Sequence, residues 1–219
     1  MARKVNSWSA FASTKRGCGL TELRVGGLAR LSTCDWPGQL VATVFCQGCG
    51  WRCAYCHNPH LLPAQSDTLV PWAEVQAFLA RRRGVLDGVV FSGGEPLGQT
   101  GLPDAVAEVR DAGFLIGLHT AGPLPQRLAE VLPGLSWVGF DVKVPFDRYD
   151  TLTGVPGSGE AARESLRMVR DSGVAFETRT TVDPACVDAE SLAAIDADLA
   201  ALGLPPSRRQ AYRPPPGPR

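Results

Sequence analysis

Short apolar runs alternate with longer amphipathic segments along most of this chain, and no other feature limits its fold as strongly. The apolar runs of four to eight residues predict strands, and the segments between them carry the periodicity of helices. Such alternation is typical of βαβ units, which build a parallel sheet. The strands are expected at residues 40–46, 88–91, 114–118, 137–144, 174–182 and 208–212. The helices are expected at residues 72–83, 102–112, 126–132, 159–171 and 189–202.

These strands are too few to close an eight-stranded barrel. We therefore expect an α/β fold, a partial, open (β/α)6 TIM-like barrel with parallel strands; a flat doubly wound sheet is the alternative. A short strand pair is expected in residues 22–33, around a Gly-Gly pair. The length of 219 residues suits one domain. We place it at residues 22–213, between a Ser-, Gly- and Arg-rich arm at 1–21 and a Pro-rich tail at 214–219.

The charge of the chain is balanced. Lys plus Arg, 22 residues, equals Asp plus Glu, also 22, and the basic residues form no stripe. Neither nucleic acid nor an acidic membrane surface is expected as a partner. No apolar stretch approaches the ~20 residues of a membrane span, and the N-terminus lacks the apolar core of a secretory signal. We therefore expect a cytoplasmic protein.

Three cysteines stand close together after the first parallel strand. Cys49, Cys53 and Cys56 are separated by three and then two residues. In a chain of this size such packing indicates a metal or catalytic site and not a disulfide framework. Three thiolates can hold a 4Fe-4S cluster while one iron keeps no protein ligand. An open coordination position of that kind is typical of a catalytic metal.

Zinc is the alternative occupant of this loop. Cys46 would supply the fourth thiolate, and His57 or His60 could replace a cysteine. Structural zinc sites usually place a dozen or more residues between two ligand pairs, whereas only three separate the pairs here. Cys46 also ends an expected strand, so a buried thiol is a second interpretation of it. No role is predicted for Cys18, Cys34 and Cys186.

A second motif, Ser-Gly-Gly-Glu-Pro at residues 92–96, follows the next strand. Glycines let a backbone approach a ligand closely, and Glu95 adds a charged acceptor, so the motif suits an ammonium-bearing ligand. Polar residues also close the later strands. They are His119, Asp141, Lys143 and Arg179. Because parallel barrels place their active sites at this end of the strands, the sequence predicts a single site there.

Two of these polar positions have structural alternatives. Asp141 and Lys143 lie on the same side of their strand, where they could form an internal ion pair. His119 is equally well explained as a hydrogen-bonded core histidine. Beyond Arg179, we expect few additional basic residues at the strand ends, and that scarcity favours a macromolecular substrate over a small one.

Taken together, the motifs resemble the radical S-adenosylmethionine superfamily, and within it the activating proteins of anaerobic ribonucleoside-triphosphate reductase. The resemblance extends over residues 22–213. It is carried by the segments at residues 35–38, 45–49, 55–59, 91–99, 141–143 and 179–182. One departure is His-Thr-Ala-Gly at residues 119–122, where relatives typically carry Asp-Thr-Asn-Gly.

The resemblance implies a 4Fe-4S cluster on Cys49, Cys53 and Cys56, with S-adenosylmethionine bound at the free iron. It implies these cofactor contacts: Tyr55 and His57 beside the adenine, Gly93, Gly94 and Glu95 at the amino group, and Asp141 and Lys143 at the ribose and carboxylate. No catalytic residue is implied beyond the cluster-bound cofactor.

The implied activity is that of a radical S-adenosylmethionine activating enzyme. Reductive cleavage of S-adenosylmethionine would give a 5′-deoxyadenosyl radical, which takes a hydrogen from one glycine of a partner. The expected partner is a glycyl radical enzyme, anaerobic ribonucleotide reductase, and the expected electron donor is flavodoxin or ferredoxin. A rival is an enzyme acting on a small molecule, similar to 7-carboxy-7-deazaguanine synthase. A zinc-binding adaptor or an iron–sulfur electron carrier is the alternative from another class.

Overall fold

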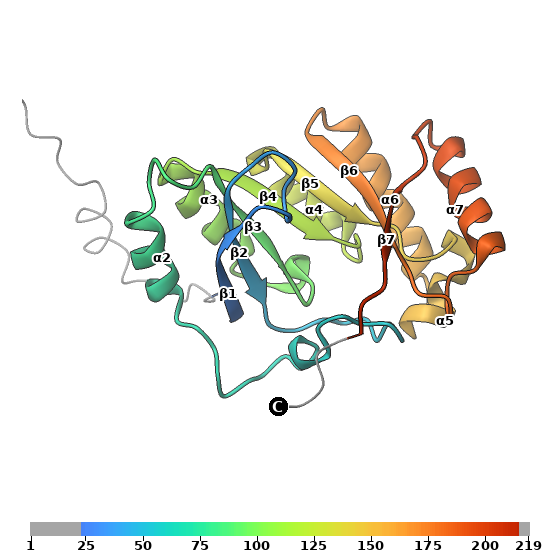
Figure 1. Cartoon of the computed structure of the whole chain (residues 1–219), viewed down its shortest axis with the longest axis horizontal. Helices are drawn as coiled ribbons and strands as arrows, with labels where there is room; N and C mark the ends of the chain where they lie inside the picture. The colour runs from blue at the N-terminus through green and yellow to red at the C-terminus, as the bar shows by residue number, and fades with distance from the viewer. Residues whose placement is uncertain (1–22, 215–219) are drawn as a thin grey trace, which may run out of the picture.

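The computed structural model describes residues 23–214, which form one seven-stranded sheet (Figure 1). The strands follow one another across the sheet in chain order. They are β1 (Val25–Ser32), β2 (Val41–Cys46), β3 (Gly88–Gly93), β4 (Leu115–Thr120), β5 (Trp137–Asp141), β6 (Ala175–Val182) and β7 (Arg208–Ala211). Strands β2 to β7 are parallel, and β1 and β7 lie at the two ends of the order. The prediction of an open α/β fold with six parallel strands is confirmed.

The expected strand pair in residues 22–33 is wrong. Val25–Ser32 is a single strand that pairs antiparallel with β2 over its whole length, so the sheet is not entirely parallel. The Gly-Gly pair marks a register shift in that pairing. A side chain on Gly26 would lie 2.4 Å from the side chain of Gln47, so this position packs tightly inside the fold and does not form a turn.

Helices follow the parallel strands and cover one face of the sheet (Figure 1). They are α2 (Trp72–Ala80), α3 (Leu102–Asp111), α4 (Pro125–Val131), α5 (Tyr149–Thr153), α6 (Ser158–Asp171) and α7 (Ala189–Ala201). Helix α5 was not expected from the sequence. Helix α2 ends at Ala80, three residues before its expected end. No helix in residues 23–214 has both the length and the apolar character that a membrane crossing requires.

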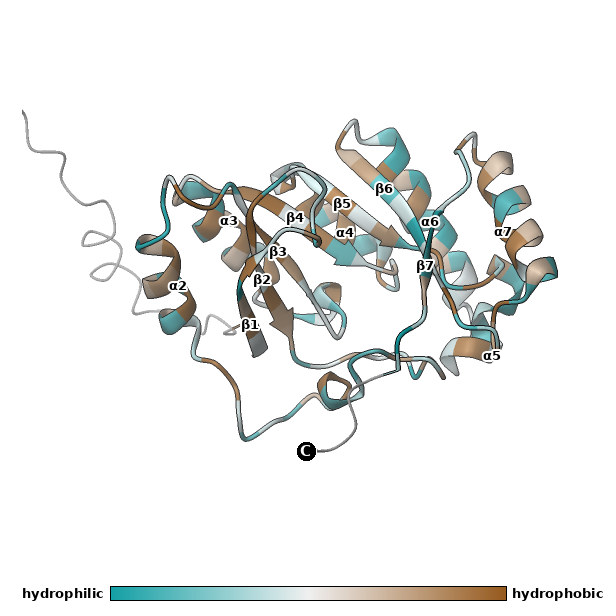
Figure 2. Cartoon of the chain, in the orientation of Figure 1, coloured by the Kyte–Doolittle hydropathy of each residue, from teal (hydrophilic) through white to brown (hydrophobic). Residues whose placement is uncertain are grey.

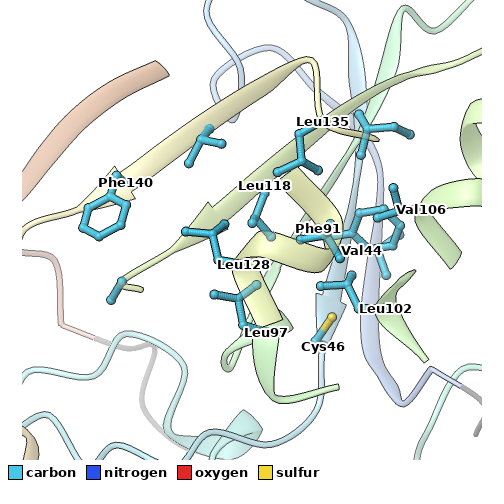
Figure 3. Packing of buried hydrophobic residues seen from close by; sticks show 14 of the residues in the cluster. Val44, Cys46, Phe91, Leu97, Leu102, Val106, Leu118, Leu128, Leu135 and Phe140 are labelled. Atoms are coloured by element: carbon cyan, nitrogen blue, oxygen red, sulfur yellow. The ribbon is translucent and has the colours of Figure 1, made fainter. Parts of the chain in front are cut away.

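The main core lies between the sheet and these helices. Alternate residues of the strands enter it, as with Val44 and Cys46 of β2, and the helices add residues such as Leu102 and Leu128 (Figure 3). Figure 2 shows that β2 to β4 are the most hydrophobic strands, whereas β6 and β7 are more hydrophilic. Burial of the apolar face therefore sets which side of each strand faces the helices. The polar residues lie on the other face and at the strand ends.

A smaller apolar cluster covers the opposite face of the sheet. Trp36, from the loop after β1, stacks on Trp137 of β5 with ring centroids 5.5 Å apart. A side chain on Gly117 would lie 2.9 Å from Trp36, and one on Gly139 would lie 2.8 Å from Trp137. Glycines therefore make room for the two indoles, and the indole of Trp36 holds its loop against the sheet.

Candidate active site

The three cysteines lie on the loop between β2 and α2, and backbone hydrogen bonds fix its shape. The amide of Cys49 donates to the carbonyl of Leu62 at 3.1 Å. The amide of Cys56 donates to the carbonyl of Cys53 at 3.1 Å, which closes a turn. The side-chain amide of Gln47 donates to two carbonyls farther along the same loop. The loop is therefore held by hydrogen bonds within itself, from its backbone and from the side chain of Gln47, at the carboxyl end of the parallel strands.

All three thiols line one cavity of about 660 Å³. Burial, together with the charge of Glu95, raises the pKa of Cys49 to about 11, and burial also raises the pKa of Cys53. Among residues 23–214, no three His, Cys, Asp or Glu side chains converge on one ion position. In a 4Fe-4S cluster each thiolate binds a different iron, so the thiols need only share a cavity. The donor set fits such a cluster, whose positive metal ions would favour the thiolates.

Cys46 lies on the other side of the sheet, in the main hydrophobic core (Figure 3). It is fully buried, and that burial raises the pKa of its thiol far above the usual range. Its interpretation as a buried thiol is confirmed. Cys34 is exposed and lines the cavity, whereas Cys186 is partly buried and packs against the core. Cys18 lies outside the described residues.

The glycines at the end of β3 bring two loops together. A side chain on Gly93 would lie 2.5 Å from the amide nitrogen of Cys46, and one on Gly94 would lie 2.4 Å from the carbonyl oxygen of Gly48. The amide of Gly94 donates to the carbonyl of Cys46 at 2.9 Å. Both glycines line the cavity. They are required for the approach of the cysteine loop itself, a role that the sequence motif alone did not indicate.

Glu95 is buried beside these glycines, and its carboxylate is held by three donors. It accepts from the amide of Leu97 at 3.0 Å, the hydroxyl of Thr120 at 2.8 Å and the amide of Ala121 at 3.3 Å. Burial raises its pKa to about 7 against the opposing effect of these hydrogen bonds. A cationic ligand in the cavity would favour the ionised form.

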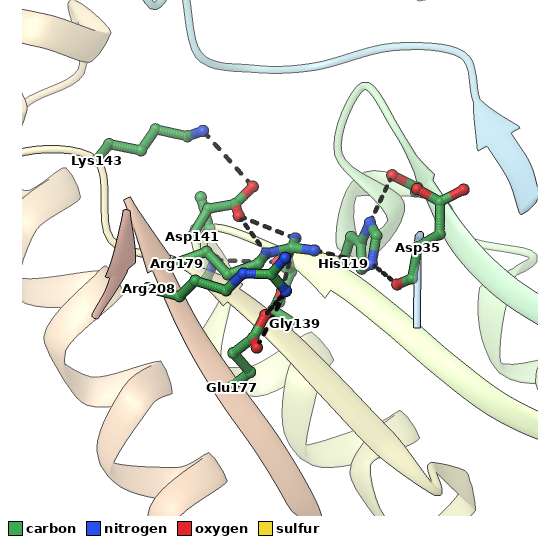
Figure 4. A network of polar contacts seen from close by, with 12 residues as sticks. Asp35, His119, Gly139, Asp141, Lys143, Glu177, Arg179 and Arg208 are labelled. Atoms are coloured by element: carbon green, nitrogen blue, oxygen red, sulfur yellow. Dashed lines mark hydrogen bonds and ion pairs between the residues drawn. The ribbon is translucent and has the colours of Figure 1, made fainter. Parts of the chain in front are cut away.

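A chain of ion pairs begins where β5 ends (Figure 4). The ammonium of Lys143 lies 3.9 Å from the carboxylate of Asp141, which also pairs with the guanidinium of Arg179 at 2.9 Å. Burial would raise the pKa of Asp141, but Arg179 and Lys143 outweigh it and hold the pKa below its usual value. The ion pair between Asp141 and Lys143, which the sequence offered as a structural alternative to a cofactor role, is present, and both residues line the cavity.

His119 extends this chain toward the loop after β1 (Figure 4). Its Nε2 lies 2.7 Å from the carbonyl oxygen of Asp35 and 3.0 Å from the guanidinium of Arg179, and its Nδ1 lies 3.2 Å from the hydroxyl of Ser92. Burial and the charge of Arg179 lower its pKa to about 4. His119 is therefore neutral near pH 7, and it is both hydrogen-bonded and part of the cavity wall.

Tyr55 and His57, the expected neighbours of an adenine, both line the cavity. The hydroxyl of Tyr55 donates to the carbonyl of Lys143 at 2.9 Å, and the amide of Lys143 donates to the hydroxyl of Tyr149 at 2.9 Å. Two tyrosines thus fix the turn after β5 against the cysteine loop. The side chain of His57 is exposed.

Sequence reasoning missed the last wall of the cavity. Strand β7 and the residues after it bring Arg208, Arg209 and Arg213 into the lining. The expectation of few basic residues beyond Arg179 is therefore wrong. A signal was present in the sequence, because Arg208 and Arg209 stand in the strand expected at residues 208–212. The structure pairs Arg208 with Arg179 in the neighbouring strand, which puts both side chains on one face.

Comparisons with known proteins agree with this geometry. The model of the Radical SAM superfamily matches residues 43–190. "Putative glycyl-radical enzyme activating enzyme MJ1227" of Methanocaldococcus jannaschii is 31% identical over 196 residues, which cover 81% of this chain and 78% of that protein. The pyruvate formate-lyase-activating enzyme of Clostridium pasteurianum is 31% identical over 173 residues, or 76% of this chain and 71% of that enzyme.

Among solved structures, SuiB of Streptococcus suis bound to S-adenosylmethionine has a TM-score of 0.62 at 12% identity. The match covers 78% of this chain and only 40% of SuiB, and at this identity it shows the fold alone. The family match, in contrast, extends over most of the chain and includes the three cysteines. This chain therefore belongs to the radical S-adenosylmethionine superfamily, whose enzymes use a 4Fe-4S cluster and S-adenosylmethionine.

Proposed function

We propose that this protein is an activating enzyme that generates a glycyl radical on an anaerobic ribonucleotide reductase. One observation carries the proposal. Three thiols, the Gly-Gly-Glu segment and the Asp141–Lys143 pair all face one cavity at the carboxyl ends of the parallel strands. Two relatives with names of glycyl-radical activating enzymes support the choice of reaction. The choice of anaerobic ribonucleotide reductase as the partner rests on the sequence motifs.

In this proposal Cys49, Cys53 and Cys56 would hold the cluster and would leave one of its irons without a protein ligand, where S-adenosylmethionine would bind. When bound, the cluster supplies the electron that splits the sulfonium into methionine and a 5′-deoxyadenosyl radical. The chain provides position and a site with little water, which are the protein's usual contributions in cofactor chemistry. Such positioning can supply ~7–11 kcal/mol of the barrier.

Each remaining contact has a proposed partner on the cofactor. The Glu95 carboxylate, next to Gly93 and Gly94, accepts from the amino group. Asp141 faces the ribose hydroxyls, and Lys143 faces the carboxylate. Tyr55 and His57 lie beside the adenine. The ion pairs around Asp141 keep it charged, because Arg179 and Lys143 hold its pKa low despite burial.

The departure at residues 119–122 is compatible with this arrangement. His119 occupies the position of the usual acid, and it is neutral and bonded to the loop after β1. Ala121 reaches Glu95 through its backbone amide, so that contact does not need the amide side chain of the usual asparagine.

Hydrogen transfer then completes the proposed reaction. One C–H bond of a partner glycine breaks, one C–H bond forms at C5′ of 5′-deoxyadenosine, and the unpaired electron stays on the glycine. The electron consumed per cleavage comes from a flavodoxin or ferredoxin. No proton is released, so the chain needs no general base at this step.

Electron paramagnetic resonance tests the proposal. Anaerobically reconstituted protein, dithionite, S-adenosylmethionine and the reductase are expected to give a glycine-centred doublet. Cys53→Ala should lose both cluster and cleavage, and Cys186→Ala should keep them, since Cys186 packs outside the cavity lining. Cleavage of S-adenosylmethionine without a doublet would contradict the proposal.

A second candidate, a radical enzyme that acts on a small anionic molecule, is favoured by one observation. Arginines of β7 line the cavity, and extra basic residues are what a small-substrate pocket would need. Turnover of a pterin-like carboxylate, with no glycyl radical on the reductase, would identify that activity.

A further inference from the structure

Strand β7 has one edge to which no other strand of residues 23–214 is paired, because β7 pairs only with β6 there. The amide of Tyr212 donates to the carbonyl of Val182 in β6 at 3.0 Å. Because backbone groups alternate in direction along a strand, those of Arg209 and Ala211 point away from β6. An edge of this kind can pair with an extended segment of another chain.

This edge leads to the active-site cavity. The ring of Tyr212, directly after β7, lies 6.4 Å from the ring of Tyr55 on the cysteine loop. Figure 1 shows the chain from β7 passing toward that loop. Gln210 and Ala211 also line the cavity. A segment that paired with β7 would therefore run along the cavity mouth.

Two guanidinium groups mark the same rim. Arg208 lies 3.4 Å from both carboxylate oxygens of Glu177, and its side chain keeps 56% of its surface exposed. Arg213 is exposed, and in the described part of the chain it has no ion pair. Arg179 and Arg209 differ in exposure, because their side chains keep only 9% and 30% of their surface exposed and are held by Asp141 and Asp196 respectively. Arg208 and Arg213 thus have donors to offer to an incoming anion.

We propose that the free edge of β7, with Arg208 and Arg213, docks an extended acidic segment of the partner protein that carries the target glycine. This inference rests on the proposed function. Main-chain hydrogen bonds to β7 would align the segment, and its carboxylates would pair with the two guanidiniums. A glycine suits the position next to the cavity, because it lets the backbone approach the radical closely.

The exposure of the arginines favours a protein segment over a small anion. A small-molecule site buries most of its ligand, and its polar groups converge inside the pocket. Arg208 instead keeps more than half of its side chain exposed. The buried cation of the cavity lining is Arg179, which Asp141 already binds.

Two peptide probes test the inference. Both carry a central glycine deuterated at Cα; one has aspartates beside the glycine and the other has asparagines. Deuterium in 5′-deoxyadenosine measures hydrogen transfer. The wild-type protein is expected to show a KM about tenfold lower for the aspartate peptide, and the preference should fade as salt is raised. Arg208→Glu combined with Arg213→Glu should abolish or reverse it.

Two further variants control for folding and for general charge effects. Arg208→Lys combined with Arg213→Lys should keep most of the preference, because it keeps both charges. Arg167→Glu, on helix α6 and outside the cavity lining, should behave as wild type. Its side chain is similarly exposed, at 47%, and its ion pair with Glu160 spans 4.0 Å.

The remaining outcomes overturn the inference in separable ways. Equal use of the two peptides, together with a glycyl radical on the reductase, would overturn the docking surface and leave the proposed function intact. A raised KM for S-adenosylmethionine in the Glu variants, with an unchanged peptide preference, would assign the arginines to the cofactor. Absence of hydrogen transfer from both peptides and of a radical on the reductase would remove the proposed function, and the docking surface with it.

Discussion

His119 joins two parts of the cavity wall, the loop after β1 and the ion pairs of Asp141, and it does so as a neutral ring. Both partners of its Nε2 are distant in sequence. The carbonyl oxygen of Asp35 lies 2.7 Å from this nitrogen, and the guanidinium of Arg179 lies 3.0 Å from it. Because a proton on this ring would face Arg179 in a buried site, protonation disfavours the folded state. The residue therefore links the stability of the site to pH.

We predict that His119→Gln removes an acid-sensitive part of the stability. The pKa of His119 is lowered from 6.5 to about 4 by burial and Arg179. Between these values only the unfolded chain binds the proton, so wild-type stability is fully present above pH 6.5 and falls as the pH drops toward 4. The loss is about 2–3 kcal/mol. Urea unfolding at pH 7, 5.5 and 4.5 measures the difference between wild type and variant.

Glu95 gives both proteins a pH dependence of the opposite sign. Burial raises its pKa from 4.5 to about 7, so its contribution favours the folded state at low pH and declines as the pH rises through this range. That contribution is common to both proteins and cancels in the comparison. A stability difference that stays constant from pH 7 to 4.5 would contradict a buried, neutral His119.

At the scale of elements, the contact between the turn after β3 and the cysteine loop depends on glycine. We predict that Gly94→Ala displaces the cysteine loop, because the new Cβ would lie 2.4 Å from the carbonyl oxygen of Gly48. Overpacking against backbone costs about 1–3 kcal/mol. Gly98→Ala is the matched control, since a Cβ at that position would have no neighbouring atom within 4 Å. The iron content after reconstitution and the urea concentration at the midpoint of unfolding should both fall for Gly94→Ala and stay unchanged for Gly98→Ala.

Strands β2 to β5 were predictable, because each enters the main core with alternate residues, as β2 does with Val44 and Cys46. Helix α5 was missed because its five residues are too short to show a helical period. The strand pair expected in residues 22–33 failed for another reason. A Gly-Gly pair is typical of turns, but pairing along the whole of β2 keeps this segment extended.

The parts of the site that lie within one sequence motif, or at the end of an expected strand, could be predicted. Cys49, Cys53 and Cys56 share a cavity because they share a loop, and the rule that polar residues meet at the strand ends brought Asp141 to them. The bond between His119 and Asp35 joins residues 84 positions apart, and no spacing in the chain indicates it. Arg213 follows the last strand, where side-chain direction depends on how the chain leaves the sheet.

At the scale of the whole molecule, the proposed cofactor contacts come from β2, β3 and β5, which are brought together only by the sheet. The cysteine loop and the turn after β5 already touch through the hydroxyl of Tyr55 and the carbonyl of Lys143, at 2.9 Å. A ligand that contacts both segments stabilises them together, because it binds only the arrangement in which both are closed. Local opening of either segment would then require release of the same ligand.

We predict that S-adenosylmethionine, added to the cluster-loaded protein, slows amide hydrogen exchange in residues 47–62 and 142–148 to a similar degree. Helix α3 (Leu102–Asp111), on the far face of the sheet, should change little. Cys53→Ala should show no such slowing, because it would lack the iron that holds the methionine part. Mass spectrometry of exchanged peptides measures all three segments. Slowing confined to one of the two segments, or equal slowing in Cys53→Ala, would show that the cofactor does not bridge them.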